Sequence, residues 1–490
     1  MSTFVEPEIA QSRVHCNTQI ARKFSPRSAP YRHSRNLEQQ RPGSPLVSRR
    51  EKTATSLRLL ASTVYAHLLM LVCSANLIAL LAISLGSHRS AASLPCDAAT
   101  AITANLAVAI AIRQDYIVNC LFAICRNVPH SAPLSVRKRL AKVYENGGAH
   151  AGAAVSAMVW SAILLAAAIR QQIQGESGSL PVLCLSSALF VCLLLIIVAS
   201  LPQLRFKHHN VFENIHRVGG WTCVMLSWPT LVFLLRQQAR DNSVHNRMLG
   251  NLVLRAPAFW LLNIISIHVL YPWLLLRKMA VVKHERLSDH ALRVYFSGRE
   301  RMQPLRTIAL SSVPLREWHS FAVLSGEGSI AGGSRSCIVS NAGDWTSSVT
   351  RQPPSHFYTR GLPKAGVLET AMAFRSIVLM ATGSGIAPCL ATLGQLPETK
   401  IRLIWSAPNP METFGKSIMD LVMQLDSEAL IHNTRVDPSQ RPDLVQMACD
   451  AYDGEEAEAV FFISNRKLTQ VIVKELKAKE IPTFAPIFDS

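Results

Sequence analysis

The sequence predicts a multi-pass α-helical membrane domain followed by a soluble module, in which a small antiparallel β-barrel precedes an α/β parallel-sheet domain. Hydrophobic residues make up 49% of the 490 residues and charged residues only 17%, below the roughly 25% typical of soluble domains. The apolar residues gather between Leu59 and Leu276, in stretches longer than a globular core helix needs. After His284 the pattern changes to short alternating runs with polar breaks, which are typical of strands.

Six stretches are long enough to cross a bilayer, because about 20 apolar residues at 1.5 Å each span a hydrocarbon core of about 30 Å. The predicted spans, within a membrane domain at 56–280, are 59–85, 98–125, 147–169, 180–202, 218–235 and 251–276. Arg113, Gln114 and Asp115 interrupt the second stretch. Since 98–112 alone is too short, we expect a tilted or kinked span that continues to Cys125.

The net charge of +18 is interpreted first as a topology signal and an attraction to anionic lipid. Lys and Arg gather at the N-terminus, in the second and fourth loops and after the last span, namely in 1–55, 126–146, 203–217 and 277–283. The loops 86–97 and 170–179 carry only Arg89 and Arg170, whereas 236–250 is an exception with three arginines. The positive-inside rule therefore predicts that both termini face the cytoplasm, which requires an even number of spans.

Composition also limits the partners and the compartment. Residues 1–55 are rich in Ser, Arg, Pro and Gln, so we expect a disordered, basic cytosolic tail. No basic helix carries interleaved base-reading residues, and nucleic acid is not an expected partner. The eleven cysteines show neither a CxxC pair nor zinc spacing, which argues against a disulfide framework or a zinc site.

Three histidines lie within or at the end of predicted spans and are candidate metal ligands, because ionisable residues at bilayer depth are costly. The predicted topology places His150, His216 and His268 near the cytoplasmic face, where two imidazoles could hold one b-type haem. The alternative is that they are interfacial histidines bonded to headgroups, carbonyls or neighbouring helices. We expect no haem or one, and favour none.

The clearest motif follows an apolar run in the second half of the chain. The predicted strand 376–381 leads into Thr382-Gly383-Ser384-Gly385-Ile386-Ala387-Pro388 and then a helical pattern through Leu393. Glycines allow a sharp turn and the close approach of a pyrophosphate, which then faces the positive end of the new helix. The spacing is not the usual G-x-G-x-x-G, and such a turn can also be purely structural.

Neighbouring strands strengthen the binding interpretation. Apolar runs at 401–405 and 459–463 end at Ser406 and Ser464, and helical stretches lie between and after them. Strand–helix alternation predicts a parallel sheet, whose ligands bind at the carboxyl ends of its strands. Four shorter runs precede this domain, at 292–296, 308–310, 320–324 and 336–339, and predict the barrel over about 285–370.

Several motifs resemble known families. Thr382–Pro388 resembles the nicotinamide-nucleotide loop of the ferredoxin reductase superfamily. Residues 317–322, Glu-Trp-His-Ser-Phe-Ala, resemble the His-Pro-Phe-Thr/Ser flavin motif of membrane ferric reductases and NADPH oxidases. Residues 212–221 resemble the helix-opening stretch of the membrane domain of those same proteins. More narrowly, the stretches 342–345, 403–410 and 486–490 resemble fungal integral membrane proteins of the TmpA type, and the resemblance covers about 56–490. A similar C-terminal unit occurs on some fungal adenylate-forming reductases.

The resemblance implies a ferredoxin-reductase-like module, with an FAD-binding barrel at 285–370 and an NAD(P)-binding domain at 373–490. It implies a membrane-bound, flavin-dependent oxidoreductase that oxidises NAD(P)H and passes electrons to an unspecified acceptor. The cofactor-binding residues expected from it are His319, Ser320, Phe321, Thr382, Gly383, Gly385, Ile386, Ala387, Pro388, Ser406 and Phe488. No catalytic residue is assigned.

Departures from the flavin motif support a second hypothesis. Ser320 replaces the proline, and Ala322 replaces the residue whose hydroxyl would bond the flavin. No Gly-Pro-Tyr-Gly-like flavin-phosphate stretch is visible, and Arg360-Gly-Leu-Pro363 is the nearest substitute. The alternative function is therefore a non-catalytic membrane regulator or scaffold with a degenerate reductase module.

Reporter fusions after residues 92, 136, 175 and 490 test the topology. We expect the reporters to lie outside, inside, outside and inside, because the Lys- and Arg-rich segments should stay in the cytoplasm. A reporter at 490 that faces outward would contradict the six-span arrangement.

Overall fold

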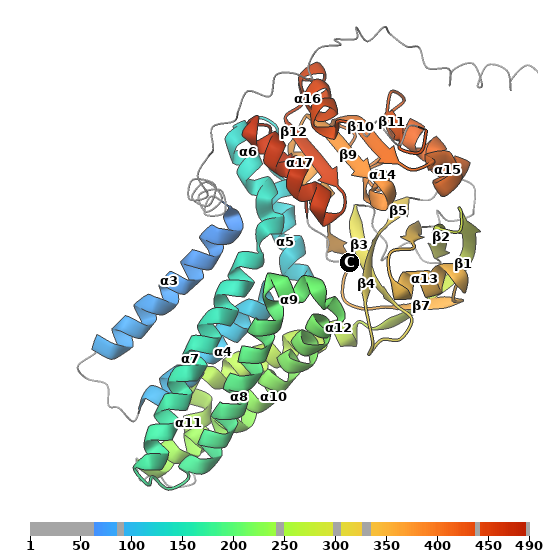
Figure 1. Ribbon diagram of the computed structural model, residues 1–490. Helices are drawn as coiled ribbons and strands as arrows, with labels where there is room; N and C mark the ends of the chain where they lie inside the picture. Colours follow the sequence, from blue (N-terminus) through green and yellow to red (C-terminus); the bar gives the residue numbers. More distant parts are fainter. Residues whose placement is uncertain are drawn as a thin grey trace, which may run out of the picture. The chain divides into compact units, whose positions relative to one another are not determined.

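The computed structural model describes residues 63–85, 93–241, 249–296, 305–325, 335–436 and 442–486. The predicted tail at 1–55 and Phe488 lie outside these residues. In the described part, apolar helices come first and two sheets follow (Figure 1). We call the apolar helices between residues 63 and 274 the helical domain and residues 277–486 the strand module.

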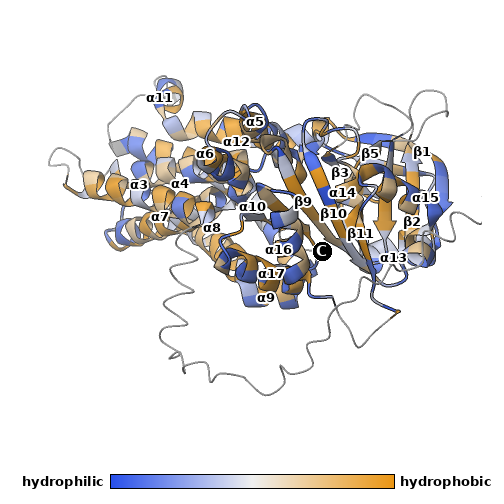
Figure 2. Cartoon of the chain, turned by 90° about the horizontal axis from the view of Figure 1, so that it is seen from above, coloured by the Kyte–Doolittle hydropathy of each residue, from blue (hydrophilic) through white to orange (hydrophobic). Residues whose placement is uncertain are grey.

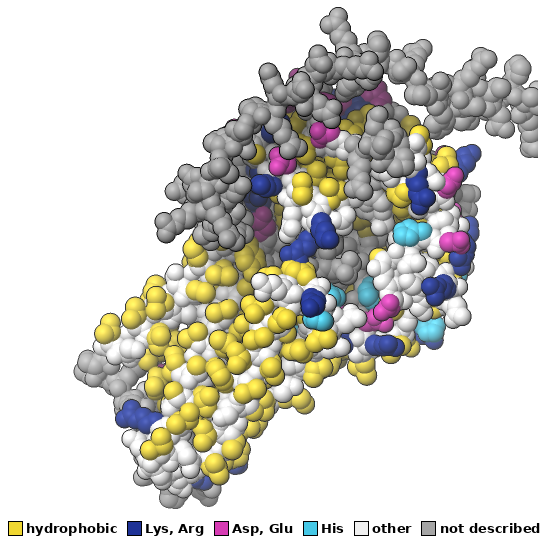
Figure 3. All heavy atoms as spheres, viewed as in Figure 1, with side chains coloured by type: hydrophobic (Ala, Val, Ile, Leu, Met, Phe, Trp, Pro, Cys, Tyr) yellow, Lys and Arg dark blue, Asp and Glu magenta, His cyan; other side chains and the backbone are white. Residues whose placement is uncertain are grey.

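Six helices of the described chain are long and apolar enough to cross a membrane. They are α3 (Val64–Leu85), α4 (Leu94–Ala111), α7 (Gly147–Ile173), α8 (Ser179–Ser200), α10 (His209–Asp241) and α12 (Pro257–Leu274). Figure 2 shows hydrophobic residues along these helices, and on the visible face in Figure 3 hydrophobic side chains cover most of their surface. The short helices α9 (Pro202–Lys207) and α11 (Leu249–Arg255) lie in the connections. Six candidate spans agree with the number of predicted apolar stretches and with the even number that the loop charges require.

A polar cluster joins three of these helices. The side-chain amides of Asn76 in α3 and Asn105 in α4 bond one another, with N···O distances of 3.0 and 2.7 Å. Trp160 in α7 donates its indole N–H to the Asn76 oxygen at 2.9 Å. Since no residue of α3 is buried among protein atoms, these bonds and the contacts of α3 with α7 hold this helix against its neighbours.

The second span differs from the prediction. Helix α4 starts before the predicted span and ends at Ala111, and a separate helix, α5 (Asp115–Arg126), follows the break at 112–114. Asp115 contacts the strand module, because its oxygens accept from Leu362 N–H at 3.1 Å and lie 3.0 Å from Lys364 Nζ. The predicted continuation to Cys125 is therefore wrong, and α5 belongs with the strand module.

Three elements between α4 and α7 pack into the strand module. They are α5, α6 (Leu134–Leu140) and the 3₁₀ helix η2 (Ala141–Glu145), and we call residues 115–145 the intermediate helices. Cys125 and Ala141 are 1% and 0% exposed and belong to the same hydrophobic core as the parallel sheet. The Asn119 amide donates to Pro363 O at 2.9 Å and accepts from Ala365 N–H at 2.8 Å. These helices are thus an integral part of the module's core.

A buried ion pair completes this contact. Arg137 Nη1 and Nη2 donate to the two carboxylate oxygens of Glu458 at 2.6 and 2.7 Å, and Nη1 also donates to Ala373 O. Burial alone would raise the pKa of Glu458, but the bonds from Arg137 and from the Arg375 N–H lower it. A second pair joins Arg126 to the buried Glu369 at 2.9 Å.

The first sheet of the module is antiparallel and nearly closes into a barrel. Its strands are β1 (Arg277–Arg286), β2 (Ala291–Phe296), β3 (Arg306–Ser311), β4 (His319–Ala322), β5 (Leu324–Ser325), β6 (Arg335–Ser340), β7 (His356–Thr359) and β8 (Lys364–Ala365). Strands β4 and β5 are consecutive along the chain yet lie at opposite ends of the order β4-β3-β7-β1-β2-β6-β5, so the sheet curls round. Helix α13 (Asp344–Arg351) supplies Trp345 and Val349 to its interior.

The second sheet is parallel, with the order β11-β10-β9-β12-β13. Its strands are β9 (Ser376–Thr382), β10 (Lys400–Ala407), β11 (Leu430–Asn433), β12 (Ala459–Ile463) and β13 (Thr483–Phe484). Val378 and Met380 face the core beneath α16 (Leu444–Gly454) and α17 (Arg466–Ala478). Ile377 and Leu379 face the opposite core beneath α15 (Pro410–Leu425). The strands that follow β9 in the chain are added first on one side of it, as β10 and β11, and then on the other side, as β12 and β13. This reversal of direction creates a crevice at the carboxyl ends of β9 and β12.

Replacing Arg137 by Met should destabilise the protein by about 3 kcal/mol, the lower end for a broken buried ion pair, because the Glu458 side chain keeps 18% exposure. Thermal unfolding in detergent measures the loss, and Arg139→Met in the exposed part of α6 is the matched control. Because the pKa of Glu458 is lowered, the pair stabilises the fold above the ordinary glutamate pKa. This contribution fades as the pH falls towards the lowered pKa. Equal midpoints for both variants would show that the pair does not hold the intermediate helices.

Candidate functional site

The glycine-rich segment turns sharply at the end of the central strand. After β9, the 3₁₀ turn η5 (Gly383–Gly385) leads into the short helix α14 (Ile386–Leu390). Gly383 has φ +52°, and a Cβ at this position would meet nothing within 4 Å. A Cβ on Gly385 would lie 2.4 Å from Ile463 O, so this glycine is needed for the loop to approach β12. Beyond Leu390 the chain continues in turns rather than in the predicted helix, since the next bonds are of the i→i−3 kind.

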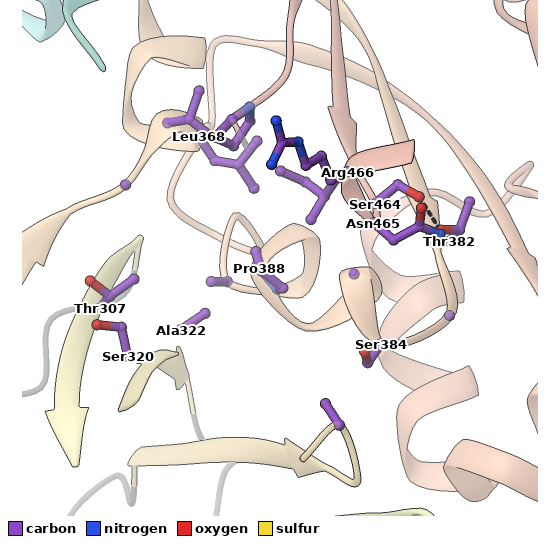
Figure 4. A pocket seen from close by; sticks show the side chains of 18 of the residues that line it. Thr307, Ser320, Ala322, Leu368, Thr382, Ser384, Pro388, Ser464, Asn465 and Arg466 are labelled. Atoms are coloured by element: carbon purple, nitrogen blue, oxygen red, sulfur yellow. Dashed lines mark hydrogen bonds between the residues drawn. The ribbon is translucent and has the colours of Figure 1, made fainter. Parts of the chain in front are cut away.

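Polar groups at the ends of the neighbouring strands hold this loop in place. The hydroxyls of Thr382 and Ser464 hydrogen-bond across the ends of β9 and β12 (Figure 4). From β10, Trp405 donates its indole N–H to Gly383 O at 3.0 Å. Ser406, at the end of β10, is 6% exposed and lines the same cavity as the loop. The carboxyl ends of the three strands therefore meet, as the sequence predicted.

The loop opens into a cleft of about 1410 Å³. The barrel contributes Thr307 and Ser320, whose hydroxyl side chains lie on the paired strands β3 and β4 (Figure 4). The parallel-sheet domain contributes Thr382–Gly385, Pro388 and Ser464–Arg466. The barrel and the glycine loop both line this cleft, so a single ligand in it can contact both.

The charge of the cleft is one-sided. The described residues that line it include five cations, Arg113, Arg205, Arg306, Lys364 and Arg466, and two histidines, His209 and His290. No Asp or Glu is among the described lining residues. A cleft lined by a single sign of charge concentrates ligands of the opposite sign, so it suits an anion.

The barrel motif is divided between two faces of β4. Ser320 and Ala322 line the cleft, whereas His319 stacks on Trp345 with ring centroids 4.4 Å apart. Phe321 also packs against Trp345, at 5.8 Å. The alternation of side chains along a strand explains this division. The structure thus brings Ser320, but not His319 or Phe321, to the cleft.

The other predicted residues divide into those that line the cleft and those that are buried away from it. Gly383, Gly385, Pro388 and Thr382 line the cleft, while Ile386 and Ala387 are 0% and 7% exposed and do not line it. Arg360, in the predicted substitute for a flavin-phosphate stretch, stacks on Trp273 and Trp318 instead. Burial, and then Arg217, lower the pKa of Arg360 to about 10.

Two of the three candidate metal ligands come together. The rings of His150 and His216 have centroids 5.8 Å apart, and His150 Nδ1 lies 2.8 Å from Ala109 O. His268 bonds the Tyr116 hydroxyl at 2.6 Å and the Ile264 carbonyl at 2.7 Å. In the described chain no group of three or more His, Cys, Asp or Glu is arranged to hold a metal ion. The expectation of no haem, or of one at most, stays a prediction, and His150 and His216 are the two candidate ligands that lie together.

Sequence reasoning missed the residues that the helical domain contributes to the cleft. Arg113 comes from the break between α4 and α5, and Arg205 and Phe206 come from α9. Thr307 was also missed, because the predicted strand starts at residue 308 whereas β3 starts at Arg306. Charge was the available signal for both arginines, but in the sequence alone Arg205 indicates topology and Arg113 interrupts the second predicted span.

The chain is similar to two fungal reductases and to several flavin-binding structures. A model of the C-terminal domain of adenylate-forming reductase 03009 matches residues 367–490. Adenylate-forming reductases 03009 and 06235 of Coprinopsis cinerea are 36% and 37% identical over 390 and 391 residues, which is 79% of this chain. The chain spans 37% of the length of each of these relatives. The predicted likeness to such reductases is confirmed.

Among solved structures, a ferredoxin NADP+ reductase from Neisseria gonorrhoeae with bound FAD and NADP is 15% identical, with a TM-score of 0.35. The match covers 44% of this chain and 98% of that protein. A flavohemoglobin from Malassezia yamatoensis with bound FAD and heme is 15% identical, with a TM-score of 0.39, over 80% of this chain and 98% of that protein.

Proposed function

We propose that the chain is a membrane-embedded oxidoreductase of the ferredoxin-reductase type that binds FAD and NAD(P)H and oxidises the nicotinamide nucleotide. The observation that carries this proposal is the shared cleft, in which the glycine loop after β9 and the hydroxyl face of the barrel both line one cationic cavity. The order of an antiparallel near-barrel and a parallel sheet agrees with the implied module. Both Coprinopsis relatives are named as reductases, which points in the same direction.

The residues present fit the two dinucleotides. Gly383 leaves open space where a side chain would stand, which allows a phosphate to approach the backbone. Thr307 and Ser320 supply hydroxyls on the barrel wall, and Arg306 and Lys364 supply positive charge beside them. A bound flavin supplies the capacity to accept a hydride from a nicotinamide. The protein's part is to hold both ligands in one cleft and to balance their phosphate charge.

The helical domain supports a membrane location. The intermediate helices follow the second candidate span and contact the module that follows the sixth. With one crossing per helix, both segments fall on the same side of a bilayer, as the loop charges predict. We propose that this side is the cytoplasm and that both termini lie there.

A non-catalytic regulator or scaffold is the second candidate function. Ala322 lines the cleft without the hydroxyl that the flavin motif normally supplies, and His319 is turned towards Trp345. A module that keeps its fold but binds no flavin would have this appearance. The absorption spectrum of the purified full chain separates the two functions, since bound oxidised flavin is visible and an empty scaffold is colourless.

Replacing Gly383 by Asn should weaken NAD(P)H binding about tenfold or more, equivalent to about 1.4 kcal/mol. Asn tolerates a positive φ, so the turn should persist while the new side chain occupies the open space beside the cleft. Isothermal calorimetry with NADPH and NADH measures the loss.

Gly394→Asn is the matched control, because Gly394 also has a positive φ (+69°) and open surroundings but does not line the cleft. Equal affinities of the two variants for both nucleotides would mean that the glycine loop is structural and that the nucleotide binds elsewhere or not at all.

A further inference from the structure

The loop between β3 and β4, residues 312–318, exposes two apolar side chains at its tip. Val313 and Leu315 are 53% and 72% exposed, and Arg316 follows them as an exposed cation. The turn is closed, because Arg316 N–H donates to Val313 O at 2.9 Å, and a second bond, from the Trp318 indole N–H, crosses it at 2.7 Å. Scattered exposed apolar residues are ordinary on a soluble domain. Two of them on the tip of one fixed turn form a patch, and its surroundings decide what it contacts.

The β3–β4 loop is fixed to the ends of two candidate spans. Arg217, in α10, donates to Arg316 O at 2.7 Å. The Trp318 ring meets the edge of Trp273, in the last turn of α12, with ring centroids 6.4 Å apart. The guanidinium of Arg360 lies 4.4 and 5.1 Å from the centroids of these two rings. The loop is therefore held where α10 and α12 meet the strand module.

These anchors lie at the boundary between apolar and charged surface. Val218 follows Arg217 and is 55% exposed. Leu274 follows Trp273 and is 79% exposed. Exposed cations come next in the chain, since Arg277–Lys278 begins β1. Apolar residues, aromatic rings and then Lys and Arg follow one another here as they do at a membrane interface.

We propose that the β3–β4 loop enters the interface of the membrane that the helical domain spans, with Val313 and Leu315 against the acyl chains and Arg316 at the headgroups of anionic phospholipid. An apolar tip followed by a cation suits this surface, because apolar area leaves the water while the cation stays among negative headgroups. This inference rests on the proposed membrane location. It adds a lipid contact that none of the spans provides.

The hairpin that carries this loop also carries part of the candidate site. Thr307 on β3 and Ser320 on β4 line the cleft, and the β3–β4 loop joins these two strands. The lipid contact at the turn therefore holds the barrel wall of the cleft at the membrane surface, in addition to the bonds that hold it to α10 and α12.

The test uses the full chain in lipid nanodiscs that contain anionic phospholipid, with one fluorescent amino acid in place of Leu315. Phospholipids with a nitroxide on the upper part of the acyl chain quench a fluorophore that lies in the interface. Two further positions calibrate the result. Ile267, which is 62% exposed in α12, reports whether a candidate span lies in lipid, and Met423, which is 41% exposed in α15, reports on an apolar position elsewhere on the module.

We expect the nitroxide lipids to cause a loss of emission from the fluorophore at Leu315 and at Ile267, and no loss at Met423. Arg316→Gln should reduce the loss at Leu315 but not at Ile267, because the attraction between the cation and the headgroups is removed. Nanodiscs of zwitterionic lipid should have the same effect as Arg316→Gln. The matched control is Arg351→Gln, which removes an exposed cation of α13 and should leave the emission at all three positions unchanged.

The results that would overturn the inference are distinguishable. Quenching at Ile267 without quenching at Leu315 would mean that the loop does not touch lipid, while the proposed membrane location stands. No quenching at either position would mean that the membrane location fails and the loop contact with it. Equal quenching at Leu315 and Met423 would contradict a contact that belongs to the loop, and quenching at Leu315 that ignores both lipid charge and Arg316→Gln would contradict anionic lipid as its partner.

Discussion

The bidentate pair between Arg137 and Glu458 is the interaction on which the arrangement of this protein depends. Arg137 is 4% exposed and has no other carboxylate partner within the described residues, so its charge is tolerable only while Glu458 lies opposite it. The pair joins a helix from the first half of the chain to the strand β12 region of the second half. It thereby forces the intermediate helices into the core of the strand module, where Cys125 and Ala141 are almost fully buried.

This constraint also defines the cleft. Residues 115–145 are held in the module. Because of this, the turn that carries Arg113 lies at the cleft beside the glycine loop, and so do the residues that precede α7. The cleft is therefore composite, with a barrel wall, a loop wall and a helical wall. A module expressed without the intermediate helices would expose the hydrophobic surface that Cys125 and Ala141 now cover, and would lack one side of its site.

Much of the fold was predictable, for identifiable physical reasons. Strand β9 is apolar from Ile377 to Ala381 because both faces of a parallel sheet are covered by helices, and this pattern is unambiguous. The second span was mispredicted because apolar residues of α5, such as Val118 and Phe122, pack on the module at Ala365 rather than on lipid, and hydropathy alone does not separate these environments. Strand β1 was missed because its mostly exposed side chains leave no clear alternation.

The sequence predicted the glycine loop of the candidate site better than it predicted the barrel wall or the helical wall. Thr382, Gly383, Gly385 and Ser406 followed from strand ends and turn chemistry, which are local properties. The assignment of His319 and Phe321 to the flavin came from motif likeness and did not consider that alternate residues of β4 face opposite sides. The helical wall depends on contacts between segments distant in the sequence, and no local pattern reports them.

The central claim is that one cleft holds a flavin and a nicotinamide nucleotide in reactive proximity. The most direct measurement is the absorption spectrum of the full chain, saturated with FAD under anaerobic conditions, before and after addition of NADPH or NADH. The account predicts that at least one nucleotide bleaches the oxidised flavin band of the protein-bound cofactor. Bound flavin that stays oxidised with both nucleotides, or a chain that binds no flavin, would contradict it.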